Sequence, residues 1–454
     1  MPDGTEQDSD LLELAKRVVA QAKPDEQMEV YVSRLDEVDV RAFDGDIESL
    51  SSASASGVGI RVVCGGRQGF AHAGALDESL IAATLDDARD NVRYATPDEH
   101  VGLAVPDGVE AVELDLWDPG VASFATPDKV QMALDLEKRV RHGDPRIRQV
   151  VSADYGDMMG ESAIATSTGI LATSRRTLCS LSVSAIAGDE DRHTGTGFGF
   201  ARGPSGIDPE SIADDAIDRA TRLIGAKKVG SSVCTVVLDR RVSATLLAVV
   251  AGALSGESVI KNRSMFAGRI GEAVAVPELT LVDDPTDARS LGAARNDAEG
   301  LACRRNLLID GGILNRFVFD TTSARRAGTS STGSAVRGGY ATTPTSGCRA
   351  VALAPGYLDQ AGVLRAVGEG LFVQSVTGVH SGVSSVSGDF SVGVEGLMLR
   401  GGALAEPVHE VTIASTLQRM LKSLVVIGGD VEWLPGVAAA QTLAIAGMSL
   451  SGSS

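Results

Sequence analysis

The residues with the most evident capacity for chemistry lie in a glycine- and serine-rich stretch, residues 378–399, which reads GVHSGVSSVSGDFSVGVEGLML. It contains His380, Ser381 and Asp389, the three residue types of a nucleophilic hydrolase triad. No Gly-x-Ser-x-Gly elbow accompanies them, and serines beside glycines commonly bond to loop backbone groups instead. Two further interpretations therefore stay open: plain loop structure, or a surface that lines a peptide groove or a partner interface.

A second candidate is the pair His409-Glu410 in PVHEVTIA, residues 407–414. In an HExxH zinc site, two histidines one helical turn apart share a face with the glutamate. Here position 413 is Ile413, and the apolar residues alternate as in a strand. Because neighbouring strand residues point to opposite faces, the pair cannot serve one metal ion.

Cysteine chemistry and nucleotide binding find little support in the sequence. The five cysteines are odd in number and far apart, and no Cys-x-x-Cys pair suggests a zinc cluster or a disulfide framework. Cys348 follows Ser-Gly and could be exposed, but no neighbour in sequence would activate its thiol. Gly195, Gly197 and Gly199 resemble a phosphate loop only superficially, and we expect a strand that another backbone approaches closely.

The overall composition excludes several classes of protein. The formal charge of −19 argues against a nucleic-acid partner, which would require a basic surface. No apolar run is long enough to span a membrane, and the acidic start of the chain lacks the features of a signal peptide. We therefore expect a cytoplasmic protein. The arginine pairs 304–305 and 325–326 are interpreted as solvated faces or interface anchors.

At 454 residues the chain is longer than a single core usually supports, so we expect two domains, residues 1–228 and 229–454. The predicted class is α+β. The first domain combines strands and helices with a possible internal duplication, because two similar acidic helices each follow a set of strands. The second is mainly antiparallel β with flanking helices.

Periodicity and end signals predict the individual elements. Strands are expected at residues 28–35, 37–43, 47–56, 59–63, 68–73, 177–187, 193–201, 234–238 and 407–414, and within 162–172. Helices are expected at residues 10–22, 77–92, 126–142, 209–224, 241–254 and 415–427. Asp208 is expected to cap the helix at 209–224, with Pro209 at its first position and Gly225 after its end, and Thr126 to cap the helix at 126–142. Residues 304–310 and 313–320 flank Gly311-Gly312, the clearest hairpin signal in the chain.

Several segments together resemble the TldD/PmbA family, once called modulators of DNA gyrase, and within it the TldE (PmbA) branch. They follow one another in family order and span most of the chain: VRAFDGDIESLSSASASGVGIRVV, RRNLLIDGGIL, TTSARRAG with STG, GVHSGVSSVSGDFSVGVEG, PVHEVTIA and IGGDVEWLPG. The resemblance implies one subunit of an intracellular heterodimeric metallopeptidase that acts on unfolded peptides. In the metal-bearing TldD branch, a helix with HExxxH and a later cysteine hold the zinc.

The matching helix here, residues 241–254 with its continuation to residue 266, contains no histidine, and no cysteine follows Cys348. We therefore expect no catalytic residues and no metal or other cofactor in this chain, with zinc in a TldD-type partner. The expected partners are that subunit and unfolded peptides, or a second copy when the subunit is missing. Candidate substrate or interface residues are His380, Ser381, Gly388, Asp389 and Phe390. The alternatives are a non-proteolytic homo-oligomeric scaffold and a metal-independent Ser/Cys hydrolase.

Overall fold

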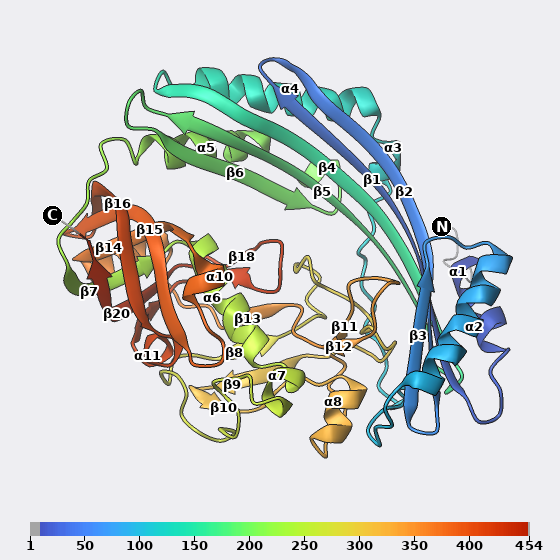
Figure 1. The fold of residues 1–454 in the computed structure, drawn as a ribbon. Coiled ribbons are helices and arrows are strands. Elements are labelled where there is room, and N and C mark those ends of the chain that lie inside the picture. Colours follow the sequence, from blue (N-terminus) through green and yellow to red (C-terminus); the bar gives the residue numbers. More distant parts are fainter. Residues whose placement is uncertain (1–9, 453–454) are drawn as a thin grey trace.

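A long curved sheet of antiparallel strands spans the N-terminal half of the chain in the computed structural model, which describes residues 10–452 (Figure 1). Its strand order is β3-β2-β1-β4-β5-β6. The strands are β1 (Gln27–Phe43), β2 (Asp46–Cys64), β3 (Arg67–Ala73), β4 (Ile147–Thr166), β5 (Leu171–Ala187) and β6 (His193–Ala201). The helices of this half are α1 (Asp10–Val19), α2 (Glu78–Tyr94), α3 (Gly120–Ser123), α4 (Thr126–Gly143) and α5 (Pro209–Thr221).

Two strand pairs that we expected to be separate are continuous. Residues 28–35 and 37–43 both lie in β1, and residues 47–56 and 59–63 both lie in β2. Gly57 and Gly59, which divide the second pair in the sequence, mark a close approach of the C-terminal half instead. A Cβ atom at either position would overlap Tyr340. The prediction of a break was wrong because these glycines serve a contact rather than a turn.

The curved sheet carries an internal repeat about its centre. The units β1-β2-β3-α2 and β4-β5-β6-α5 occupy equivalent places on either side of the β1–β4 pair. In each unit a glycine on the edge strand lets the helix approach. A Cβ on Gly69 would overlap the backbone of α2, and one on Gly195 or Gly197 would overlap that of α5. The expected duplication and the expected close backbone approach are both confirmed.

The end signals were partly correct. Asp208 caps α5 as predicted, because its side chain accepts hydrogen bonds from the backbone N–H groups of Glu210 and Ser211 at 3.1 and 3.2 Å. The N-cap of α4 is Ala125 rather than the predicted Thr126. The strand expected within residues 162–172 is broken by a turn at Gly169, whose φ of +97° suits only glycine well.

The C-terminal half is built around a sheet that closes on itself. Its order is β16-β15-β14-β7-β20-β17, and β16 also pairs with β20. Only the β7–β14 pair is parallel. The strands are β7 (Ser232–Leu238), β14 (Gly370–Thr377), β15 (Asp389–Arg400), β16 (Ala403–Thr416), β17 (Leu424–Ile427) and β20 (Leu443–Ser451). The expected mainly antiparallel character of this half is confirmed.

Smaller elements surround this barrel-like sheet. A four-stranded sheet contains β8 (Leu281–Asp283), β9 (Asn306–Asp310), β10 (Ile313–Leu314) and β13 (Val351–Leu353). Two ribbons pair β11 (Ala335–Val336) with β12 (Thr345–Ser346), and β18 (Glu432–Trp433) with β19 (Ala439–Ala440). The predicted hairpin turn is confirmed between β9 and β10, where Gly311 and Gly312 have φ of +53° and +79°.

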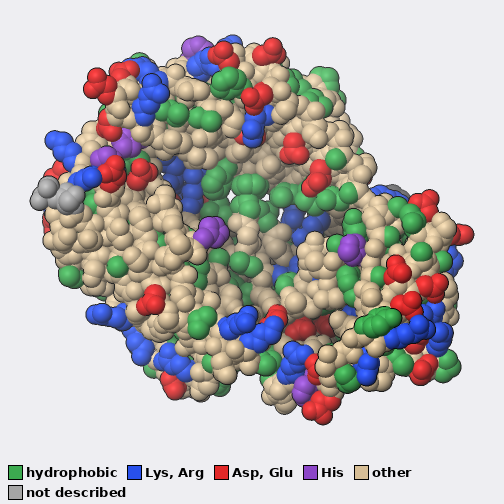
Figure 2. All heavy atoms as spheres, in the orientation of Figure 1, with side chains coloured by type: hydrophobic (Ala, Val, Ile, Leu, Met, Phe, Trp, Pro, Cys, Tyr) green, Lys and Arg blue, Asp and Glu red, His purple; other side chains and the backbone are tan. Residues whose placement is uncertain are grey.

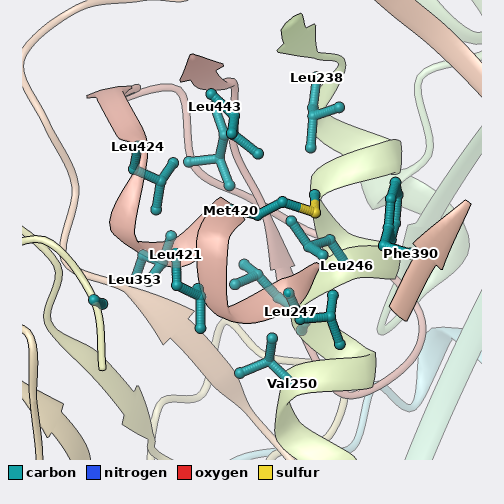
Figure 3. Close-up of a cluster of buried hydrophobic side chains, with 14 of the residues drawn as sticks. Leu238, Leu246, Leu247, Val250, Leu353, Phe390, Met420, Leu421, Leu424 and Leu443 are labelled. Carbon is teal, nitrogen blue, oxygen red and sulfur yellow. The ribbon is translucent and has the colours of Figure 1, made fainter. Parts of the chain in front are cut away.

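The helices of this half are α6 (Arg240–Ala253), α7 (Gly256–Ile260), α8 (Thr321–Arg326), α9 (Gln360–Val367), α10 (Val379–Gly382) and α11 (Leu417–Lys422). Leu246, Leu247 and Val250 of α6 meet Met420 of α11 in the core (Figure 3). The helix expected at 415–427 was wrong in extent. Thr416 ends β16 and caps α11, and the β-branched run at 425–427 pairs with β20 as part of β17.

Residues 95–119, which lack regular secondary structure, are tied to the C-terminal half by the arginine pairs noted in the sequence. Arg304 forms an ion pair with Asp107 at 2.6 Å, and Arg326 pairs with Asp98. Arg325 donates to the backbone oxygen of Leu103 at 2.8 Å. Arg304, Arg325 and Arg326 therefore hold residues 95–119 against the C-terminal half of the same chain. The domain division at 228/229 stays a prediction.

Among residues 10–452, every helix is too short or too polar to cross a lipid bilayer. The acidic start of the chain, residues 1–9, lies outside the described residues.

Candidate functional site

The predicted site loop connects β14 to β15 and is held by its own hydrogen bonds. The backbone N–H of Gly388 donates to Ser384 O at 2.8 Å, and Ser384 N donates to Asp389 O at 2.9 Å. Gly388 is buried with φ of +85°, and a Cβ there would overlap the side chain of Gln418. The Nε2 of Gln418 donates to Ser387 O at 3.1 Å. The loop is thus a defined turn whose glycine is required by packing.

The triad residue types do not form a relay within the described residues. The Ser381 hydroxyl donates to Gly378 O at 3.3 Å. The Asp389 carboxylate accepts from Ser387 Oγ at 2.6 Å rather than from His380. His380, Ser381 and Asp389 are all exposed. Their present contacts satisfy the loop and leave their outer surfaces open to another molecule.

Phe390 differs from the other candidates because its ring belongs to the core. It is 6% exposed and packs near Leu246 (Figure 3). Its side chain therefore has little surface to offer a substrate. The functional role of the five candidate residues stays a prediction.

His409 and Glu410 separate as the strand pattern predicts. Glu410 lies at a bulge of β16 with φ of +50° and forms an ion pair with Lys228 at 2.7 Å. His409 instead approaches His193, with ring centroids 5.9 Å apart. His409 and Glu410 thus contact different residues, and they do not form one ligand site.

The helix α6 presents no metal-binding side chain outside the core. Its N-cap is Asp239, whose side chain accepts from the backbone N–H of Arg241 at 3.0 Å. The positions that are not buried are Arg240, Arg241, Ala244, Thr245, Ala248, Val249 and Gly252. Beyond α6, the carboxylate of Glu257 is paired with Lys261.

Cys348, which contacts α6, is buried. Cys348 is 7% exposed, which corrects the suggestion of an exposed thiol, and its Sγ lies 3.8 Å from Ala251 O. Burial raises the pKa of the Cys348 thiol well above its usual value. A protonated, enclosed thiol is a poor nucleophile and a poor metal ligand.

A hollow separates the curved sheet from the C-terminal half, with Lys or Arg side chains at both ends and hydrophobic side chains between (Figure 2). One end, here called the α6 pocket, has a volume of about 250 Å³. It is lined by Thr194, Thr196, Arg219, Arg241, Val242, Thr245, Gln374, Ser375 and Val376. It places the edge strand β6 beside α6. The Arg241 guanidinium lies 3.8 Å from the ring centre of Phe198.

The other end, here called the arginine pocket, has a volume of about 240 Å³. It lies between the sheet and loops of the C-terminal half. Its lining residues are Tyr31, Ser162, Ile164, Ala172, Thr173, Ser174, Arg176, Ala294, Asn296, Asp297, Ala298, Arg337 and Arg349. This pocket is lined mainly by polar groups, and each half of the chain forms one of its sides. We therefore treat it as a second part of the candidate site.

A buried ion network joins the two halves beside the arginine pocket. Glu29 of β1 accepts from Arg61 of β2 at 2.5 Å and from Arg337 at 2.7 Å. Although burial opposes ionisation, these two guanidinium groups hold the pKa of Glu29 below its ordinary value. Burial raises the pKa of Glu299, which lies 3.8 Å from Arg61. The network fixes how the sheet meets the C-terminal half.

Sequence reasoning missed the arginine pocket. Arg176, Arg337 and Arg349 are spread over distant segments, and only the arrangement of the two halves brings them together. No spacing in the sequence distinguishes these arginines from those on solvated faces. The exposed loop residues were found because glycine, serine, histidine and aspartate cluster locally.

Most of the chain is similar to known proteins of one family. Residues 28–92, 121–224 and 231–452 match the models for PmbA/TldA metallopeptidase domain 1, central domain and C-terminal domain. The metalloprotease PmbA of Escherichia coli O157:H7 is 28% identical over 409 residues, covering 89% of this chain and 88% of that protein.

Solved structures share the fold. The crystal structure of a proposed DNA gyrase modulator from Thermotoga maritima has a TM-score of 0.88 at 24% identity, covering 97% of this chain and 99% of that one. The crystal structure of TldE from Thermococcus kodakarensis has a TM-score of 0.88 at 20% identity, with the same two coverages.

A metallopeptidase implies a catalytic metal, and the residues present here do not fit one. The accessible side of α6 offers aliphatic, hydroxyl and guanidinium groups, whereas catalytic zinc requires imidazole, carboxylate or thiolate donors. Within residues 10–452, no group of three or more His, Cys, Asp and Glu side chains is arranged to hold an ion.

Proposed function

Because this chain belongs to the PmbA/TldD metallopeptidase family, we propose that it is the subunit without a metal site of its own in a TldD/TldE-type heterodimer. The zinc belongs to a TldD-type partner that carries HExxxH. This chain contributes walls of a shared chamber that binds unfolded peptides and presents them for proteolysis. The heterodimer works in the cytoplasm, in keeping with the scattered, odd-numbered cysteines.

The observation that carries the proposal is the accessible side of α6. It borders the α6 pocket through Arg241 and Thr245, so it lies where a substrate could reach it. Its other accessible positions are Arg240, Ala244, Ala248, Val249 and Gly252. None of these groups is an imidazole, carboxylate or thiolate, the donors that hold a catalytic metal and let it activate water. A subunit with this helix can shape the chamber while its partner supplies the chemistry.

An open strand edge supports contact with a partner subunit. β3 pairs with β2 only from Val58 to Cys64, so the first part of β2 has no strand on its outer side among the described residues. Residues 48–55 of β2 are exposed, and most are serine or alanine. Small side chains and free backbone groups suit the addition of a strand from another subunit.

The hollow supports the capture of an extended peptide. The edge strand β6 contributes Thr194 and Thr196 to the α6 pocket. A peptide that adds to such an edge is recognised mainly through backbone hydrogen bonds, so sequence matters little. The exposed His380, Ser381 and Asp389 would then line the shared cavity or the partner interface.

Reconstitution tests the proposal. The purified chain is mixed with a family member that carries HExxxH, and cleavage of an unfolded peptide is followed with and without a chelator. We expect chelator-sensitive cleavage only in the mixture. Cleavage by this chain alone that resists the chelator would favour the Ser/Cys hydrolase. Stable self-association with no activity in any mixture would favour the scaffold.

A further inference from the structure

The arginine pocket contains two guanidinium groups without a carboxylate of the described residues at ion-pair distance, although Asp283 and Asp297 act on Arg349 from farther away. Among residues 10–452, neither Arg176 nor Arg349 forms an ion pair with a carboxylate. One terminal nitrogen of Arg176 donates to Ala293 O at 3.1 Å, and the buried Nε of Arg349 has no partner. Since a guanidinium has five N–H donors, both side chains retain donors for another molecule.

The third arginine differs because a carboxylate neutralises its charge, although its buried Nε also has no partner. Arg337 is paired with Glu29 at 2.7 Å, donates to Ala298 O at 2.6 Å and lies 4.5 Å from the ring centre of Tyr31. It forms a wall of the pocket. Arg176 and Arg349 are the groups left to bind an anion.

The local electrostatics make the unpaired state of Arg176 costly. Burial, together with the nearby charges of Arg349 and Arg202, lowers the pKa of Arg176 to about 10. A negative group placed between these arginines would relieve both the desolvation and the repulsion. If burial alone decided, an apolar residue would be favoured at position 176. The presence of a guanidinium group at this position therefore points to a ligand of opposite charge.

The acidic side chain that lines the pocket, Asp297, forms no ion pair with these arginines, although the charge of Arg349 opposes the effect of burial on its pKa. Both oxygens of Asp297 are occupied by backbone N–H groups: Glu299 at 2.9 Å, Leu301 at 3.0 Å and Ala335 at 3.0 Å. Burial also raises the pKa of Asp297. Its carboxyl therefore organises the loop and leaves the arginines available.

We propose that the arginine pocket binds a carboxylate of the peptide substrate, with Arg176 and Arg349 as the binding residues. Resting on the proposed function, this assigns a preference for peptides with an accessible C-terminus or an acidic side chain. Two N–H donors of one guanidinium match the two oxygens of a carboxylate. The volume of about 240 Å³ admits one such group rather than a folded partner, and the net charge of −19 disfavours polyanions.

Binding to the isolated full-length chain tests this inference without any catalysis. One short unfolded peptide is prepared as a C-terminal acid and as an amide, and a second pair exchanges one internal glutamate for glutamine. Affinities are measured by calorimetry, with sodium acetate as a competitor. We expect one acidic form to bind about tenfold more tightly than its neutral counterpart and acetate to weaken it. The pair that discriminates identifies the source of the carboxylate.

Variants assign the effect to the pocket. Arg176→Gln and Arg349→Gln should each abolish the discrimination, and Arg176→Lys should keep part of it. Arg175→Gln changes the neighbouring exposed arginine on β5, which lies over Trp117, and should leave it intact. Equal affinity for charged and neutral peptides in the unmodified protein overturns the inference, with no variant needed. Discrimination that persists in both glutamine variants also overturns it.

The binding experiment and the reconstitution experiment test different claims and can fail independently. If charged peptides are preferred and no HExxxH partner restores cleavage, only the proposed function fails. If cleavage is restored in the mixture and this chain shows no preference, only the carboxylate site fails.

Discussion

Replacing Asp283 by asparagine is expected to stabilise the protein at neutral pH and to have little effect in acid. Asp283 is fully buried, and its Oδ1 accepts from the backbone N–H groups of Arg349 at 2.9 Å and Ala350 at 2.7 Å. Its Oδ2 has no partner. Burial raises the pKa of this carboxyl from 3.8 to about 6. Asparagine keeps the accepting oxygen and removes the charge.

The sign follows from the direction of the shift. The folded-state pKa lies above the unfolded one, so the stability contributed by protonated Asp283 is complete below about pH 4 and lost as the pH rises through about 6. A shift of roughly two units corresponds to about 3 kcal/mol. The advantage of Asp283→Asn in free energy of unfolding should therefore grow from about 0.5 kcal/mol near pH 4 to about 3 kcal/mol above pH 7.

Urea unfolding of both proteins across this pH range measures the difference directly. Asp310→Asn, at an exposed position of the same sheet, is the matched control. A difference between the Asp283 variant and the wild type that does not change with pH would refute the reasoning. So would a wild type that is the more stable protein at pH 7, because Arg349 would then stabilise the carboxylate more than burial opposes it.

Three further changes probe the elements that position the site. Gly197→Ala should lower the free energy of unfolding by about 1–3 kcal/mol, because its Cβ would overlap the backbone oxygen of Ile212, whereas Gly230→Ala in open space should change it little. Asp208→Ala should cost about 1 kcal/mol by removing the N-cap of α5, and asparagine there should recover most of this loss in thermal or urea unfolding. Arg325→Ala should speed limited proteolysis within residues 95–119, since it removes the hydrogen bonds that hold this segment; an unchanged cleavage rate would contradict that role.

Local patterns predicted much of the fold. Asp208 and Pro209 mark the start of α5 as their residue types predict, but the helix ends at Thr221 rather than at the predicted residue 224 before Gly225. Gly311-Gly312 likewise specify a hairpin through their positive φ angles. The repeat of strands followed by a helix was also visible, because the same close approach of helix to strand requires glycine in both halves.

Features that depend on distant contacts could not be predicted in this way. Gly57 and Gly59 separate two strand segments in the sequence, yet their purpose is to admit Tyr340, which is almost 300 residues away. The run at 425–427 continues a helical pattern but pairs with β20 once the sheet closes. The arginine pocket forms only when the two halves meet, and neither half contains its own signal.

The central claim is that this subunit does not hold a catalytic metal, and its zinc content tests it most directly. The isolated chain is equilibrated with zinc, freed of unbound metal and analysed for zinc per molecule by mass spectrometry. The account predicts far less than one zinc per chain, and about one per heterodimer once an HExxxH-bearing partner is added. One tightly bound zinc per isolated chain, accompanied by peptide cleavage, would contradict it.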